Sequence, residues 1–500
     1  MELGSEVSIP RRSSKVPQFI ATVLVDSLAL SFGLTMGWSS SALPLLQSAD
    51  TPLPCGPISS SDASWLVSLL CLIAMVTTPL YRYICERFGR KMCGYLTVLP
   101  GLISVVLLLL ASCTTILYIS RAIMGLTLAG TFIFCPVYVS ETVEDEVRGA
   151  LGVMLMLLRN IGICGSYILG AYCSFYTVAW LSLAPLIILL LALFWLPETP
   201  VYLLRHGKDE QATQALQRLR GKQCDVSQEL YNIKISLRDT NSEAATPASY
   251  KEFFSSPVAR RALVIMLVLN SNQQLCGFYG ILTHTVLIFE SVGSTWSPHT
   301  CSIIVGIMLV CGTFVSVILC DRVGRKVLLI TSDSIMTVCL MLISTYFYFE
   351  TKGVQQFGVL PVACLSVYVI ALNVGLASLP VLIETEIFSP RFRSTAISIT
   401  APFTWSLTFA VSKYFTTFTN WLGNYGVYWF FAAVCIIGMM LIILVLPETK
   451  GRALEVILND LETRGLCSQG CVSRRKLYTV LCNNTIDSQT LLNSPIKGPM

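Results

Sequence analysis

Twelve long apolar runs constrain this 500-residue chain more than any other feature of its sequence. A helix that crosses the hydrocarbon core of a bilayer needs about 20 mostly apolar residues, and it satisfies its own backbone polar groups. The charged fraction is only 13%, about half of what a soluble domain carries. We therefore predict an all-α, multi-spanning membrane protein. The predicted spans are 18–42, 64–84, 92–112, 115–139, 150–173, 177–196, 261–289, 301–320, 327–349, 358–383, 396–418 and 425–446.

The predicted spans fall into two groups of six, separated by a polar segment rich in Lys, Arg, Gln and Glu. Helical periodicity around 211–219 indicates short amphipathic helices in this linker. The sequence predicts an N-terminal tail, a six-helix half, a linker, a second six-helix half and a C-terminal tail. These are residues 1–17, 18–200, 201–258, 259–452 and 453–500.

The basic residues predict the orientation of the chain. Of the 34 Lys and Arg residues, Arg121, Arg159 and Lys413 fall within spans and Lys352 in a loop on the opposite side, and the others share the side of the N-terminus. Lys and Arg concentrate in cytoplasmic loops. We expect an integral protein of the plasma membrane with the linker and both termini in the cytoplasm.

Three motifs occur once in each half, in the same order and at nearly equal separations. The pairs are residues 86–91 and 321–326, Glu141 with Arg148 and Glu386 with Arg393, and residues 197–199 and 447–449. One copy alone is readily explained as a charge cluster that anchors a cytoplasmic loop. Three ordered pairs instead indicate two duplicated halves, which is the major facilitator architecture of two pseudo-symmetric six-helix units.

The charged residues of these motifs lie at cytoplasmic helix ends. We predict that their ion pairs form when the cytoplasmic side closes and break when it opens, as alternating access requires. The predicted cytoplasmic gate residues are Glu86, Arg87, Arg90, Glu141, Arg148, Glu198, Asp321, Arg322, Arg325, Glu386, Arg393 and Glu448.

More specific motifs make the chain resemble the sugar porter family of the major facilitator superfamily. They are residues 136–141 (PVYVSE), 273–277 (QQLCG) and 447–452 (PETKGR). Residues 37–44, 63–65 and 162–163 look most like arthropod trehalose and glucose facilitators. The resemblance implies facilitated transport of a hexose or a trehalose-like sugar by alternating access.

A sugar site needs hydrogen-bonding groups and an aromatic face inside the membrane. Asn270, Gln273 and Gln274 belong to the densest polar cluster in any span, and an amide both donates and accepts hydrogen bonds. The alternative is that they only hold helices together. Trp405 matches a family tryptophan that could stack on a sugar ring, and its alternatives are ordinary helix packing and an anchor at the membrane interface. The candidate substrate-binding residues are Gln273, Gln274, Trp405, Asn270, Tyr279, Met156 and Asn373.

The chain departs from the family pattern at several of these positions. Met156 and Tyr279 stand where many members carry Gln and Asn, and His284 stands at the position of a gate tyrosine. Loss of amides predicts altered or weaker hexose binding. Ser39 stands near the position at which proton-coupled members carry an acid, which favours facilitated diffusion over proton symport.

Charged residues inside spans need partners, because an unpaired charge in the membrane is costly. Asp26, Arg121 and Arg159 lie in spans one, four and five. Pairing of Asp26 with Arg159 or with Arg121 is one expectation. A position nearer the cytoplasmic surface is the other.

The same scaffold fits two other functions. A sugar sensor that does not transport, or a carrier of another small organic solute, would use the same scaffold. We expect no enzyme, because the chain lacks a glycine-rich phosphate loop, an HExxH zinc motif and a nucleophile elbow. We expect no cofactor, no catalytic or metal site and no nucleic-acid partner. The expected partners are a sugar and membrane lipid, and we expect a monomer.

Overall fold

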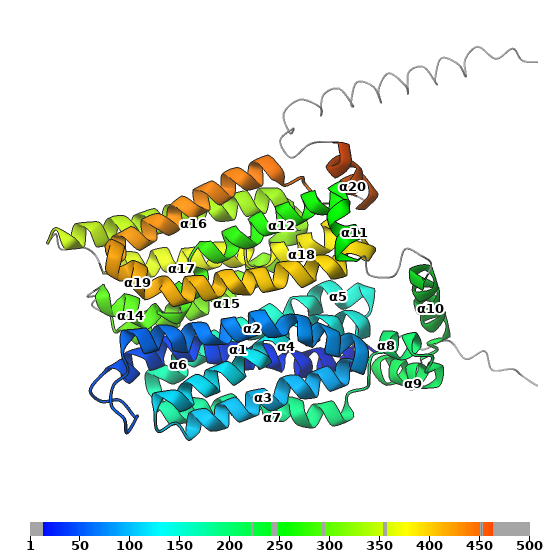
Figure 1. Ribbon diagram of the computed structural model, residues 1–500, viewed down its shortest axis with the longest axis horizontal. Helices are drawn as coiled ribbons and strands as arrows, with labels where there is room; N and C mark the ends of the chain where they lie inside the picture. The colour runs from blue at the N-terminus through cyan, green and yellow to red at the C-terminus, as the bar shows by residue number, and fades with distance from the viewer. Residues whose placement is uncertain are drawn as a thin grey trace, which may run out of the picture.

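Long apolar helices running side by side form the body of the protein (Figure 1). The computed structural model describes residues 14–221, 224–241, 249–292, 296–353, 358–450, 452 and 454–463. All regular secondary structure within these residues is helical. The fold is the predicted all-α arrangement of two six-helix halves.

Within the described residues, the first half consists of seven helices and begins with a long helix. Ser59 and Asp62 form a capping box at the start of the second helix, where each side chain accepts a hydrogen bond from the other's backbone N–H. The helices are α1 (Val16–Gln47), α2 (Ser60–Phe88), α3 (Arg90–Leu109), α4 (Thr114–Thr142), α5 (Asp145–Gly152), α6 (Met154–Tyr172) and α7 (Phe175–Trp195).

The linker helices gather at one end of the bundle, which we call the linker end, and the opposite end is the far end (Figure 1). Arg220 joins them to the first half, because its guanidinium pairs with Glu144 at 3.0 Å and with Glu229 at 2.6 Å. The linker helices are α8 (Pro200–Arg205), α9 (Asp209–Arg220), α10 (Ser227–Asn241) and α11 (Tyr250–Ser255).

The second half repeats the first, with more interruptions. Its helices are α12 (Pro257–Leu275), α13 (Phe278–Thr283), α14 (Thr285–Ser291), α15 (Pro298–Val323), α16 (Arg325–Thr351), α17 (Val359–Val374), α18 (Leu379–Ile387) and α19 (Pro390–Val445). A further helix, α20 (Leu454–Thr463), lies at the linker end against α12 and α18 (Figure 1).

Hydropathy predicted the spans correctly but did not show where they break. Span 261–289 is divided into α12, α13 and α14, with Gly277 in a left-handed conformation at φ +89°. A Cβ there would lie 2.4 Å from Phe431. Glycine is therefore required both by the positive φ and by the lack of room for a side chain. Span 358–383 is likewise divided into α17 and α18.

Among the described residues, ten helices are long and apolar enough to cross a membrane. One of them, α19, holds two spans, because its backbone leaves helical geometry at Gly423. The polar residues 270–274 lower the hydropathy of α12, so this helix is not among the ten. Together, α12, α13 and α14 form one further span. The predicted twelve spans are therefore present.

The outer surface of the bundle is apolar. Large side chains such as Phe194, Trp195 and Trp421 are 67%, 85% and 83% exposed. Lipid tails solvate such a surface, whereas a soluble protein would bury it. Together with the spans, this surface identifies an integral membrane protein.

Candidate substrate site

A compact ion-pair cluster joins three helices of the first half at the linker end. The Arg90 Nη2 lies 2.6 Å from Glu141 Oε1, and Thr199 Oγ1 donates to Glu141 Oε2 at 2.6 Å. Glu198 accepts hydrogen bonds from the backbone N–H groups of Arg90 and Lys91, at 3.0 and 3.1 Å. A carboxylate at the first turn of α3 is favoured by the helix dipole.

The second half contains the same cluster residue for residue. Arg325 Nη2 lies 3.1 Å from Glu386 Oε1, and Thr449 Oγ1 donates to Glu386 Oε2 at 2.6 Å. Glu448 accepts from the N–H groups of Arg325 and Lys326, at 3.0 and 3.2 Å. The sequence repeat is thus a repeat of three-dimensional contacts.

Glycine is required at the turn in both clusters. Gly89 has φ +97° and Gly324 has φ +106°. A Cβ on Gly89 would lie 2.5 Å from Glu198 Oε2, and one on Gly324 would lie 3.2 Å from Glu448 Oε2. The turn therefore brings the N-terminus of the next helix onto a carboxylate of its own half.

The remaining predicted gate residues also make contacts inside their own half. Glu86 pairs with Arg82 at 3.3 Å, and Arg87 donates to Tyr83 Oη at 2.8 Å. Arg148 donates a hydrogen bond to the carbonyl of residue 143, and Arg393 donates one to the carbonyl of residue 385. The backbone carbonyl of Arg322 accepts a hydrogen bond from Lys450. The side chain of Asp321 lies outside the described part of the structure. The ion pairs of Glu86, Arg90 and Arg325 each join two residues of the same half.

Contacts do cross between the halves at the far end. The Ser40 hydroxyl accepts from the Val286 N–H at 3.0 Å, and Tyr167 Oη donates to the Leu282 carbonyl at 2.6 Å. These bonds join α1 and α6 to α13 and α14. At the linker end, Arg82 donates to Ser394 across the boundary.

A lysine makes the third cross-half contact at the far end. Lys413 of α19 donates from Nζ to Ser64 Oγ at 2.8 Å, and its Nζ lies 3.9 Å from the Trp65 ring centroid. Both residues belong to α2, and Trp65 also packs against Phe409 with ring centroids 6.2 Å apart. We call Lys413 with Ser64 and Trp65 the far-end contact.

The paired glutamines lie where α12 meets the break between α17 and α18. Gln273 Nε2 donates to the carbonyl of Leu376, a buried residue within that break, at 2.7 Å. Gln274 donates to Gln273 Oε1 at 3.2 Å and accepts from Thr408 Oγ1 at 3.0 Å. Gln273 is half-buried and Gln274 is buried.

Two further predicted residues, Trp405 and Tyr279, lie against the first half. Trp405 is half-buried and meets Phe132 of α4 edge to face, with ring centroids 5.4 Å apart. Tyr279 is 3% exposed and lies next to Cys71 of α2. Met156 is half-buried on α6. Asn270 is buried on α12, one turn before Gln274.

Asn373 takes part in an amide contact that sequence reasoning missed. Asn160 of α6 donates from Nδ2 to Asn373 Oδ1 at 2.9 Å and to Thr313 Oγ1 at 2.8 Å. All three side chains are buried. A lone asparagine in an apolar span is a signal for such a contact, although the sequence does not identify its partners.

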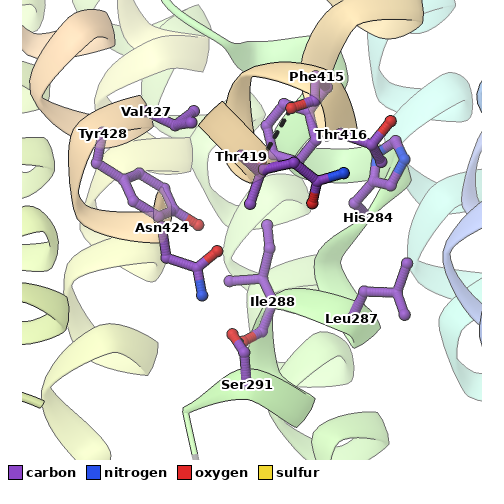
Figure 2. A pocket seen from close by; sticks show the side chains of 11 residues that line it. His284, Leu287, Ile288, Ser291, Phe415, Thr416, Thr419, Asn424, Val427 and Tyr428 are labelled. Atoms are coloured by element: carbon purple, nitrogen blue, oxygen red, sulfur yellow. Dashed lines mark hydrogen bonds between the residues drawn. The ribbon is translucent and has the colours of Figure 1, made fainter. Parts of the chain in front are cut away.

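A separate small cavity lies within the second half at the far end (Figure 2). Its volume is about 140 Å³, and His284, Phe415, Asn424 and Tyr428 are among its lining residues. The His284 ring stacks on Phe415 with centroids 4.8 Å apart. The predicted substrate-binding residues do not line this cavity, so it is distinct from the candidate site.

Two halves of six spans, with matching clusters at the linker end, define a membrane protein of the major facilitator fold. The structure resembles the E. coli xylose transporter in its inward open conformation, with a TM-score of 0.74 and 21% identity over 89% of this chain and 99% of that chain. A xylose symporter bound to 6-bromo-6-deoxy-D-glucose has a TM-score of 0.71 and 23% identity over 90% of this chain and 100% of that one.

Residues 21–461 match the family described as "Sugar (and other) transporter". The chain belongs to this family.

Curated relatives include facilitated trehalose transporters of insects. One from Anopheles gambiae is 34% identical over 451 residues, and one from Polypedilum vanderplanki is 33% identical over 452 residues. Each alignment covers 89% of this chain. The alignments cover 57% of the length of the Anopheles relative and 89% of the length of the Polypedilum relative. The chain thus spans little more than half the length of the Anopheles relative. The family to which the chain belongs is one of transporters by its description, which agrees with the expectation that the chain is not an enzyme.

Proposed function

We propose that this chain is a facilitative transporter that moves a hexose or a trehalose-like sugar across a membrane by alternating access. The observation that carries the proposal is a set of polar and aromatic side chains at the boundary between the halves. Trp405 meets Phe132 there, and Asn160 meets Asn373. Transporters of this architecture bind their substrate at such a boundary, near the middle of the membrane. The names of the insect relatives support a sugar as the substrate.

In this proposal the structure is a state closed at the far end, which faces the outside, with the linker end in the cytoplasm. The hydrogen bonds from Val286 to Ser40 and from Tyr167 to Leu282 close the outer path. The clusters around Arg90 and Arg325 keep the linker end of each half rigid. When that end closes, the two clusters approach each other and exchange partners, which is their proposed role as a cytoplasmic gate.

Transport in this proposal needs no proton gradient. Ser39, a buried hydroxyl, stands near the place of the acid of proton-coupled members. The protein acts as a monomer in the plasma membrane, with both termini in the cytoplasm because the basic residues lie on that side.

Uptake of radiolabelled glucose, fructose and trehalose by a transporter-null host, at pH 5.5 and 7.5, tests the proposal. We expect saturable uptake of at least one sugar at similar rates at both pH values. Uptake that rises several-fold at the lower pH would contradict facilitated diffusion. No saturable uptake of any of the three, with surface expression confirmed, would contradict sugar transport.

The second candidate is a sugar sensor without transport, or a carrier of another small organic solute. Tyr279 is buried where many family members carry an asparagine, and Leu309 is a buried apolar residue at a position that is polar in the family. Sugar-dependent thermal stabilisation of the purified protein without flux would favour a sensor. Competition for uptake by solutes other than sugars would favour the other carrier.

A further inference from the structure

Two arginines lie inside the membrane-spanning bundle of the first half. Arg121 of α4 is 3% exposed and Arg159 of α6 is 8% exposed. In each, the Nη2 atom is buried and has no hydrogen-bond partner among the described residues. A guanidinium carries five N–H donors and stays charged in proteins, so these groups retain both charge and unused donors.

Both side chains reach the start of α13, directly after the paired glutamines. The Arg159 guanidinium carbon lies 5.7 Å from the Phe278 ring centroid, and the charge of Arg121 lies close to the Tyr279 phenol. Arg121 also stacks on Trp38, with its guanidinium carbon 3.9 Å from the ring centroid. The two positive charges therefore approach the proposed substrate region from α4 and α6.

The carboxylate that the sequence offered as a partner does not reach either arginine. Asp26 is 1% exposed and lies beside Cys135, and neither of its oxygens is bonded to a guanidinium. Arg159 Nε donates to Asn160 Oδ1 at 3.1 Å, which is a neutral partner. Aromatic rings attract a cation but leave its N–H donors unbonded. A buried charge without a counter-charge is costly, so a negative group is expected at this place.

We propose that the transported solute supplies this negative charge, and that it is a monosaccharide bearing a carboxylate. Its carboxylate pairs with Arg159, whose guanidinium is less covered by aromatic rings than that of Arg121. Its hydroxyls bond to Gln273 and Gln274, and Arg121 adds positive potential. The inference rests on the proposed function, because it names the class of solute for the same site. A bound chloride ion has the same charge, and the experiment separates the two sources.

The test measures uptake of radiolabelled D-glucuronate and D-glucose into proteoliposomes that contain the full chain, at pH 7.5. We expect saturable glucuronate uptake, favoured by an inside-positive membrane potential because the solute is an anion. Arg159→Gln should raise the KM for glucuronate by at least about tenfold, as loss of a charged hydrogen bond predicts. Arg159→Lys should have an intermediate KM. Arg205→Gln, at an exposed position of α8, is the matched control and should leave both KM values unchanged.

Saturable glucose uptake without uptake of, or competition by, glucuronate would overturn the inference and leave the proposed function intact. If neither solute is transported, thermal unfolding of the purified protein decides. Stabilisation by glucuronate that Arg159→Gln abolishes would support the carboxylate site while transport fails. No stabilisation by glucuronate, or Arg159-dependent stabilisation by sodium chloride alone, would overturn the inference.

Discussion

The far-end contact offers a direct test of alternating access. Lys413 joins the second half to Ser64 and Trp65 of the first half through one charged hydrogen bond and one cation–π contact. Cation–π contacts contribute about 0.5–2 kcal/mol, and hydrogen bonds to charged groups about 1.5–3 kcal/mol. Lys413 is only half-buried and regains water when the contact opens. We therefore expect Lys413→Met to cost the closed state about 1–2 kcal/mol.

That free energy shifts the equilibrium toward the outward-facing state by about 5–30-fold. When the outward-facing state is a minor population, the apparent KM for uptake falls as its population rises. We expect Lys413→Met to lower the KM for zero-trans sugar uptake by up to this factor. Uptake kinetics in cells, normalised to surface expression, measure the change.

Two variants control for effects unrelated to the boundary. Lys413→Arg keeps the cation and should retain a KM near that of the wild type. Lys352→Met removes a cation that lies 5.7 Å from the Tyr348 ring centroid. Tyr348 belongs to α16 and Lys352 is the C-cap of the same helix, so this contact does not cross between the halves and the KM should not change. A KM for Lys413→Met that is unchanged or raised would refute the reasoning.

Three other predictions follow from the clusters and the paired glutamines. Glu198→Gln and Glu448→Gln should each lower the unfolding free energy by about 1 kcal/mol, since each removes a carboxylate from a helix N-terminus. Thermal unfolding in which one variant loses much stability and the other loses none would contradict the equivalence of the two clusters. Gly89→Ala should cost about 1–3 kcal/mol because of its positive φ, whereas Gly149→Ala, which has open space around its Cβ, should not lower the melting temperature. Gln273→Ala should raise the KM for sugar uptake by about 2–10-fold, as loss of one neutral hydrogen bond predicts; an unchanged KM would remove Gln273 from the site.

Much of the fold could be predicted because hydropathy and repeats are local properties of a sequence. Runs of about 20 apolar residues locate spans, and the paired motifs indicate two similar halves. The breaks in 261–289 and 358–383 were not predicted. Gly277 adopts a left-handed conformation, and Phe431, 154 positions away in the chain, fills the space that a side chain would need there.

The candidate site shows a similar limit. The sequence drew attention to Gln273 and Trp405 as polar and aromatic groups inside spans, and their roles in binding stay a prediction. It did not identify Asn160 as the partner of Asn373, or Ser64 as the partner of Lys413. These contacts depend on how each helix is rotated about its axis and which neighbour it faces.

The sequence by itself determined that the chain is a membrane protein with twelve spans in two duplicated halves, because burial in lipid demands length and apolarity within each segment. Only the tertiary structure decided which charges meet. Arg90 and Arg325 pair within their own halves, and Asp26 stays apart from Arg121 and Arg159. The physical reason is that an ion pair forms only within a few ångströms, and helix packing, rather than the order of residues, sets that distance.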